Sequence, residues 1–234
     1  MIILPYGESA LLVNFEQKID EAVNARVIRL HQALQNIAGI RYTIPAYASL
    51  TVGFDSQQVS ADELRELIYS INLQDKNAGT EGERYVIPVC YEGDFAPDMQ
   101  EVSELTGLEK PEIISLHTGT PYRVFMLGFI AGFAYLGSLP EALQCPRKQS
   151  PRKQVPQGAV GLAGFQTGIY PTDAPGGWQL IGQTPIKTFD PKAKVPVKLQ
   201  PGDQVRFKAI SQAEFESISD SVKFGTYEWE VLHG

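Results

Sequence analysis

The stretch GAVGLAGFQTGIYPTDAPGGWQLIG, residues 158–182, decides the fold of the second half of this chain. Short apolar runs alternate in it with glycine and proline, and it carries almost no charge. Glycine permits positive φ and the close approach of a ligand or a second strand, and proline favours turns. The stretch therefore predicts short strands joined by tight turns. Whether these turns also form a binding surface stays open, because most loops carry no function.

Turn signals of the same kind recur on both sides of this stretch, as far as Gly202. Runs of β-type residues separate them, which favours a β-barrel or a β-sandwich. Two short helices are expected before these strands, and Ser211 with Glu214 has the spacing of a capping box that starts a late helix. The clearest expected strands are 122–129, 178–181 and 204–207, and the early helices are 97–106 and one opened by Pro111.

The first eighty residues alternate between strand and helix signals. Asp20 can cap a helix with apolar residues at every third or fourth position, and Ser60 with Glu63 forms a capping box before a second helix. The resulting order, β-α-β-β-α-β, predicts a ferredoxin-like α/β domain, with an unrelated α+β order as the alternative. The strands in this order are 10–15, 40–44, 49–54 and 84–90.

A polar segment at residues 74–83, QDKNAGTEGE, has the composition of a surface connection. We therefore expect an α+β protein with two domains. The first is an N-terminal α/β domain at 1–80, and the second is a β-barrel domain at 81–234. The strand at 84–90 can be shared between them.

The composition excludes several classes of partner. Hydrophobic residues make up 43% of the 234 residues and charged residues 20%, the balance of a soluble globular protein. A formal net charge of −7 argues against nonspecific binding to nucleic acid. The apolar run at 124–137 is too short to span a bilayer and the N-terminus lacks a signal-peptide pattern, so we expect a cytoplasmic protein without membrane contact. Two cysteines and three histidines without ligand spacing predict no metal site.

The most concentrated positive charge lies in RKQSPRKQ, residues 147–154, between two prolines. The guanidinium groups of Arg147 and Arg152 have the donor geometry that carboxylates and phosphates need, and the two lysines are expected to matter less. The glycine-rich stretch follows directly, and its backbone amides can complete an anion site. A solvated basic loop is the alternative interpretation.

Other candidate site residues lie near this segment or on the helix that precedes it. His117 falls on the apolar side of that helix, so it is either a satisfied core histidine or a candidate catalytic group for proton transfer. Gln166 and Tyr170 can line a cleft, and Trp178 can cover a ligand or fill the core. The chain contains no P-loop, G-x-S-x-G or H-E-x-x-H motif, so no self-sufficient hydrolase is indicated.

Several uncommon motifs occur together in a fixed order. They are YGESALLVNF at 6–15, IPVCY at 87–91, HTGTPYRVFMLGFIAGFAYLGSLP at 117–140, CPRKQSPRKQVPQGAVGLAGFQTGIYP at 145–171, PGGWQLIGQTP at 175–185 and PGDQVRF at 201–207. With these motifs the chain resembles the KipI/PxpB family, also called allophanate hydrolase subunit 1. Two positions depart from the usual pattern of that family: Ala131 replaces a proline, and Ala174 replaces a serine.

This resemblance implies an N-terminal α/β domain followed by a cyclophilin-like β-barrel. It implies a subunit of a heteromeric 5-oxoprolinase that uses ATP at the level of the complex to convert 5-oxoproline to glutamate. The expected partners are a KipA/PxpC-like subunit and a PxpA-like subunit. Relatives leave two alternatives: an inhibitor that binds a histidine kinase, as KipI does, or an accessory subunit in urea or allophanate metabolism.

For 5-oxoproline, we expect Arg147 and Arg152 to frame a cleft that receives the substrate carboxylate. His117, Gln166 and Tyr170 are expected to face the same cleft. The PGGW turn, with Gly176, Gly177 and Trp178, is expected to complete it.

Overall fold

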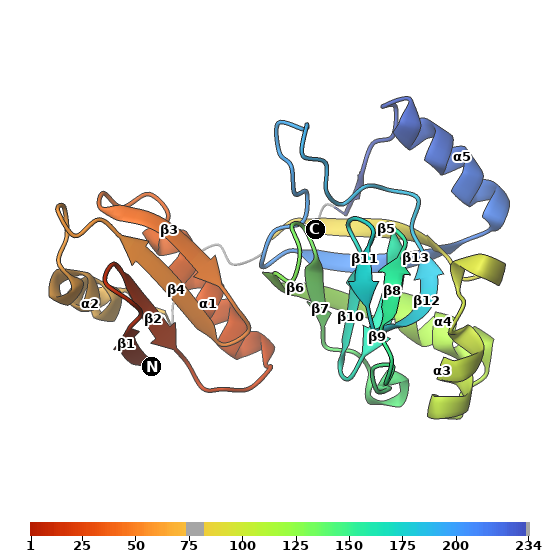
Figure 1. Ribbon diagram of the computed structural model, residues 1–234, viewed down its shortest axis with the longest axis horizontal. Coiled ribbons are helices and arrows are strands. Elements are labelled where there is room, and N and C mark those ends of the chain that lie inside the picture. The colour runs from red at the N-terminus through yellow and green to blue at the C-terminus, as the bar shows by residue number, and fades with distance from the viewer. Residues whose placement is uncertain (74–81, 233–234) are drawn as a thin grey trace. The chain divides into compact units, whose positions relative to one another are not determined.

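Figure 1 shows the computed structural model, which describes residues 1–73 and 82–232. Most of the expected connection at 74–83 lies outside the described residues. The chain divides into two compact units, residues 1–82 and 83–234.

The N-terminal unit is a four-stranded antiparallel sheet with two helices (Figure 1). The strands follow the order β1-β2-β4-β3. Apolar side chains of both helices and of the sheet form one core, which includes Val13, Leu30, Leu50 and Leu64. The elements are β1 (Ile2–Pro5), β2 (Ala10–Asn14), α1 (Glu21–Leu34), β3 (Ile40–Pro45), β4 (Ser49–Phe54) and α2 (Ala61–Ser70).

Both expected helix starts in this unit are confirmed. The Asp20 side chain accepts a hydrogen bond from the backbone N–H of Val23 at 2.9 Å. Ser60 and Glu63 form the reciprocal capping box, in which each side chain accepts from the other residue's backbone N–H. These bonds satisfy N–H groups that have no partner within the helix, so the local sequence determines where each helix begins.

The expected strand at 84–90 forms, but it does not pair in the N-terminal sheet. That strand, β5 (Arg84–Cys90), pairs with barrel strands instead. The sheet position beside β2 is occupied by β1, which forms a hairpin with β2 through a short turn containing Gly7 at φ 72°. A hairpin closes a much shorter loop than a strand returning after α2, so its entropic cost is smaller.

The second unit is a closed β-barrel of seven strands. They follow the order β12-β9-β10-β7-β6-β13-β5, and pairing of Gln183 with Cys90 joins β12 to β5 and closes the barrel. This closed barrel fits the cyclophilin-like fold that the sequence led us to expect. The strands not yet given are β6 (Pro121–Leu127), β7 (Ala134–Gly137), β9 (Ala159–Ala163), β10 (Gln166–Ile169), β12 (Gln179–Gln183) and β13 (Gln204–Ile210).

The glycine-rich stretch forms three barrel strands and one strand of a small second sheet, so the expected short strands and turns are confirmed. The small sheet pairs β11 (Ala174–Gly176) with β8 (Arg152–Val155). Gly161 and Gly168 lie opposite each other on β9 and β10. A Cβ atom on either glycine would lie 3.0 Å from an atom of Trp178, so the absent side chains make room for the Trp178 side chain.

Helices surround the barrel at the positions that the sequence predicts. The helix α3 ends at Gly107 with φ 72°, Pro111 lies in the first turn of α4, and Ser211 with Glu214 forms the capping box of α5. No helix among the described residues is long and apolar enough to cross a membrane. The remaining elements are η1 (Gly93–Phe95), α3 (Met99–Thr106), α4 (Lys110–Gly119), η2 (Glu141–Leu143), α5 (Gln212–Lys223) and β14 (Glu230–Val231).

Candidate functional site

A small pocket of about 270 Å³ lies on the barrel where the basic loop meets the ends of three strands. Its size suits a small metabolite, since pockets for drug-sized ligands usually measure roughly 300–1,000 Å³. A larger hollow of about 490 Å³ lies beside α1, but none of the expected site residues lines it. The lining residues of the small pocket are Tyr135, Pro146, Arg147, Ala163, Gly164, Gln166 and Trp178.

Arg147 supplies the positive charge of this pocket. Its side chain is exposed, and no described residue forms a hydrogen bond or an ion pair with its guanidinium. Burial raises the pKa of Tyr135, and the charge of Arg147 acts in the opposite direction. Tyr135 and Arg147 both line the pocket. Arg147 is therefore available to a negatively charged ligand.

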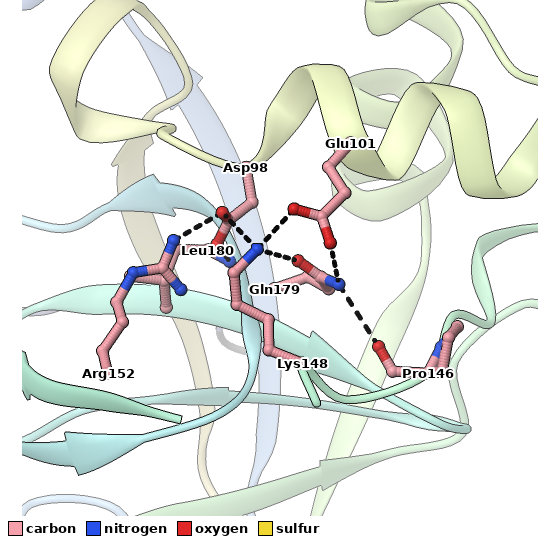
Figure 2. A network of polar contacts seen from close by, with 7 residues as sticks. All are labelled: Asp98, Glu101, Pro146, Lys148, Arg152, Gln179 and Leu180. Atoms are coloured by element: carbon pink, nitrogen blue, oxygen red, sulfur yellow. Dashed lines mark hydrogen bonds and ion pairs between the residues drawn. The ribbon is translucent and has the colours of Figure 1, made fainter. Parts of the chain in front are cut away.

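Arg152 occupies a different environment, the polar network drawn in Figure 2. Its Nη2 donates to Oδ1 of Asp98 at 2.5 Å, and Nζ of Lys148 lies 3.0 Å from the same oxygen. The other oxygen, Oδ2, accepts from the backbone N–H of Leu180 at 2.7 Å. The Asp98 side chain is only 4% exposed, so protein groups, and not water, stabilise the charge of this carboxylate.

The network holds Asp98 in its charged form. Burial acts to raise the pKa of Asp98, but the hydrogen bonds from Arg152, Leu180 and Lys148 outweigh burial and leave the pKa below its ordinary value. An ionised, buried carboxylate between two cations is a structural ion cluster. Arg152 is consequently engaged within the protein.

The network also includes Glu101, Gln179 and the backbone of Pro146, the residue before Arg147. Lys148 also bonds to Glu101 on α3 and donates to Oε1 of Gln179 at 3.2 Å. Nε2 of Gln179 donates to Glu101 at 3.0 Å and to the carbonyl of Pro146 at 3.4 Å (Figure 2). Side chains from α3, β12 and the basic loop therefore meet in one connected cluster.

His117 lies on α4 with its side chain fully buried, and no part of it lines the small pocket. Its Nδ1 is 2.8 Å from the Tyr91 hydroxyl, its Nε2 is 2.9 Å from Oγ1 of Thr167, and its ring stacks on Phe207. Burial lowers the pKa of His117 to about 3. With both ring nitrogens bonded and a neutral ring at physiological pH, His117 has the environment of a satisfied core histidine.

Aromatic side chains form the base of the pocket. Phe133 contacts Tyr135, Tyr170 and Trp178 edge to face, with ring centroids 4.9 to 5.3 Å apart. Tyr170 is buried beneath the PGGW turn, where its hydroxyl lies 2.2 Å from the position that a Cβ on Gly176 would take. Only Trp178 and Tyr135 of these rings line the pocket. Tyr170 therefore supports the turn from below.

The two glycines of the PGGW turn have different neighbours. A Cβ on Gly176 would lie 2.2 Å from the Tyr170 hydroxyl, whereas the nearest atom to a Cβ on Gly177 is the carbonyl oxygen of Lys148 at 3.5 Å. Gly176 thus permits close packing of the turn on Tyr170. Gly177 is tied to the basic loop, because its carbonyl accepts from the backbone N–H of Lys148 at 2.7 Å.

The structure thus brings Arg147, Gln166 and Trp178 to one pocket, with Arg152 and His117 held in other contacts. Sequence reasoning did not single out Tyr135, Asp98 or Gln179. The carboxylates Asp98 and Glu101 are spaced by three positions at the start of α3, as ordinary helix-surface residues often are. Nothing in that spacing indicates that these carboxylates pair with Arg152 and Lys148, which lie some fifty residues later in the sequence.

The fold and this pocket define a class of barrel protein with a small, cationic, aromatic-lined site. Over residues 1–199 the chain matches the family described as Carboxyltransferase domain, subdomain C and D. The chain belongs to this family, and the resemblance to the KipI/PxpB group that its motifs indicate is confirmed.

Individual relatives agree with this assignment. A 5-oxoprolinase subunit from Bacillus subtilis (strain 168) is 39% identical over 230 residues, which cover 92% of this chain and 95% of that protein. The solved structure of TTHA0988 superposes with a TM-score of 0.77 at 36% identity over 86% of this chain, which spans 40% of the TTHA0988 chain. The urea amidolyase of Lachancea kluyveri is 23% identical over 264 residues, and this chain corresponds to 14% of it.

Proposed function

We propose that this chain is a subunit of a heteromeric, ATP-dependent 5-oxoprolinase, which converts 5-oxoproline to glutamate. The observation that carries the proposal is the likeness to the Bacillus subtilis 5-oxoprolinase subunit along nearly the whole length of both chains. The pocket agrees with such a substrate in size and charge. The chain lacks a complete hydrolytic motif, as expected of one subunit among several.

In this proposal, the pocket holds the small anionic ring of 5-oxoproline. The guanidinium of Arg147 binds the carboxylate, because its parallel N–H groups match two carboxylate oxygens. The Gln166 amide has a donor and an acceptor, as the lactam has, and the rings of Trp178 and Tyr135 cover the ring methylenes. Gly176, Gly177 and Tyr170 shape the wall that carries Trp178.

This chain's residues bind and orient the ring, and they exclude water from its apolar side. ATP, bound at the level of the complex, supplies activation of the lactam, which resists attack by water on its own. Because the chain has no P-loop, either a noncanonical site or a partner subunit supplies part of the ATP site in this proposal. A metal site forms no part of this proposal for the chain.

The proposed partners are a KipA/PxpC-like subunit and a PxpA-like subunit. The Bacillus subtilis relative is itself named as one subunit of its enzyme, which implies that others accompany it there. In urea amidolyase, the similar segment is part of a much longer chain, so a related domain works there beside others. We place the complex in the cytoplasm, where a reducing environment suits the free thiols of Cys90 and Cys145.

For the N-terminal unit, we propose a ferredoxin-like fold in which a different strand forms one edge of the sheet. We propose that the boundary between the two domains lies near residue 80. Strands β2, β4 and β3 with helices α1 and α2 have the connections of that fold. The strand β1 occupies the edge that a final strand would otherwise fill.

A second candidate function is an accessory role in urea or allophanate metabolism. The likeness to urea amidolyase favours it, although at 23% identity that likeness is more distant than the 39% to the Bacillus subtilis 5-oxoprolinase subunit. The two candidates differ in substrate, so a substrate comparison separates them.

The test is reconstitution of the complex from separately purified subunits. ATP hydrolysis is measured with 5-oxoproline, urea or allophanate, first with this chain alone and then with both partners added. We expect negligible hydrolysis by the single chain and 5-oxoproline-dependent hydrolysis by the complex. Full activity of the single chain would contradict the division of labour, and dependence on urea or allophanate would favour the second candidate. Recovery of a histidine kinase instead of the partner subunits in a pull-down would support an inhibitor.

A further inference from the structure

The loop that carries Arg147 is fixed on both sides of that residue. The Cys145 carbonyl accepts from the backbone N–H of Gly164 at 2.7 Å, and the Pro146 carbonyl accepts from Nε2 of Gln179 at 3.4 Å. On the other side, the backbone N–H of Lys148 donates to the Gly177 carbonyl at 2.7 Å. The main chain at Arg147 is therefore held, while its guanidinium has no bond to any described residue.

The side chain of Lys148 provides further attachments of this loop. Its ammonium group contacts Asp98 at 3.0 Å, Glu101, and Oε1 of Gln179 at 3.2 Å (Figure 2). The side chain is only 19% exposed, which a lysine tolerates when its charge is paired. Burial acts to lower the pKa of Lys148, but the bonds to Glu101 and Asp98 outweigh burial and raise it, so the charge persists at neutral pH.

Consecutive residues of this loop thus have opposite surroundings. The Lys148 side chain is directed at α3 and is bonded to carboxylates, whereas Arg147 lines the small pocket. We propose that Lys148, together with Asp98 and Gln179, is a positioning residue that fixes Arg147 over the pocket for recognition of the substrate carboxylate. This inference deepens the proposed function and rests on it for the identity of the substrate.

The physical benefit is preorganisation. A bidentate contact needs the guanidinium plane in one orientation, and a mobile loop would lose conformational entropy when the ligand binds. A main chain that is already fixed leaves only the arginine side chain to be ordered. Lys148 therefore acts on substrate binding through Arg147, without touching the substrate itself.

A double-mutant cycle on the assembled complex tests this coupling. Lys148→Met removes the ammonium, Arg147→Ala removes the group it positions, and the double variant combines them. Lys153→Met is the matched control, because Lys153 is an exposed lysine of the same basic segment outside the network. KM and kcat for 5-oxoproline are measured for each, with circular dichroism to verify folding.

We expect Lys148→Met to raise KM about tenfold while kcat changes less than about threefold, as loss of preorganised binding should. In the Arg147→Ala background, the same substitution should have no further effect on KM. Lys148→Arg should restore part of the affinity, and Lys153→Met should behave as the wild type. An equal increase in KM in both backgrounds would show that Lys148 acts independently of Arg147 and would overturn the proposal.

A second measurement does not depend on the identity of the substrate. Hydrogen exchange of the backbone amides at 147–149 is compared between the wild type and Lys148→Met in the full chain. Faster exchange in the variant is expected, because the bond from Lys148 N–H to Gly177 then opens more often. Unchanged exchange would overturn the proposal even in an active complex.

The role of Lys148 can be tested even if the Lys148→Met variant does not fold or the complex does not turn over 5-oxoproline. If Lys148→Met does not fold, Gln179→Met removes the contact to Pro146 and should produce the same faster exchange and the same coupling to Arg147. If the wild-type complex does not turn over 5-oxoproline, the proposed function fails, and the exchange measurement still decides whether the loop is held.

Discussion

Nη2 of Arg152 donates to Oδ1 of Asp98 at 2.5 Å, although 54 positions separate the two residues in the sequence. The same oxygen is 3.0 Å from the ammonium of Lys148. Since Asp98 immediately precedes α3 and both cations belong to the basic loop segment, one carboxylate joins the helix to the barrel. Arg152, one of the two arginines expected to bind the substrate, thus helps to hold α3 against the barrel.

Replacement of Asp98 by Asn should destabilise the barrel unit. The cations of Arg152 and Lys148 would lose a shared buried counter-charge, and breaking a fully buried pair costs roughly 3–5 kcal/mol. Because their side chains are 26% and 19% exposed, water screens part of this loss, and we expect a decrease of about 2 kcal/mol in the free energy of unfolding.

Urea unfolding followed by tryptophan fluorescence measures this change, because Trp178 and Trp229 both lie in the barrel unit. Glu104→Gln is the matched control, an exposed carboxylate on α3, the helix that Asp98 precedes, and should change stability by less than about 0.5 kcal/mol. Equal stability of the Asp98→Asn variant and the wild type would show that the ion cluster contributes nothing to the fold.

The two arginines should differ in their effect on catalysis. Arg147→Lys in the reconstituted complex removes the forked donor geometry, and the loss of a charge-assisted contact costs about 1.5–3 kcal/mol, which corresponds to a rise in KM of roughly 10- to 150-fold. Arg152→Lys keeps a charge beside Asp98 and should change KM less than about twofold. Steady-state kinetics with 5-oxoproline distinguishes them, and similar changes in KM for both variants would contradict the assignment of Arg147 alone to the substrate.

Helix starts and turns could be predicted from the sequence, because the groups that determine them are local. Ser60 with Glu63 and Ser211 with Glu214 form the expected capping boxes within a few residues. The pairing of β5 with barrel strands could not be predicted in this way. Strand order depends on contacts between distant segments and on the entropic cost of closing the loops between them.

The candidate site was predictable in part for the same reason. The local concentration of charge indicated Arg147, but a cluster of arginines and lysines does not show which members meet a carboxylate inside the protein. Asp98 and Gln179 come from distant segments, so only the folded barrel shows that Arg152 and Lys148 are engaged. His117 illustrates the opposite case, in which its place on an apolar helix face already indicated burial.

The adjacent glycines of the PGGW turn should tolerate alanine unequally. A Cβ on Gly176 would lie 2.2 Å from the hydroxyl of Tyr170, a ring that cannot move away because it is buried against Phe133. We expect Gly176→Ala to cost about 1–3 kcal/mol, as overpacking does. Gly177→Ala meets its nearest atom at 3.5 Å, and it should cost less than about 1 kcal/mol. Neither glycine has a positive φ, so the comparison isolates steric contact. Thermal and urea unfolding measure both variants, and equal stabilities would contradict the steric explanation.

The buried His117 should make the barrel less stable as the pH falls below neutrality. Burial lowers its pKa from 6.5 to about 3 in the folded state, so between these values the unfolded chain binds a proton that the folded chain does not. The stabilisation is fully present above pH 6.5 and is lost as the pH falls toward 3. The slope approaches about 1.4 kcal/mol per pH unit, the value for one proton.

His117→Gln removes the imidazole that binds this proton in the unfolded chain. The glutamine retains a side chain that can hydrogen-bond to Tyr91 and Thr167. Between about pH 7 and pH 5, the wild type should therefore lose about 2 kcal/mol more unfolding free energy than the variant. Urea unfolding with tryptophan fluorescence at both pH values gives the comparison, because the tryptophans report on the barrel unit alone and His31 lies in the other unit. Parallel losses in the two proteins would mean that His117 takes up its proton as readily in the folded barrel as in the unfolded chain, and that burial does not hold its ring neutral.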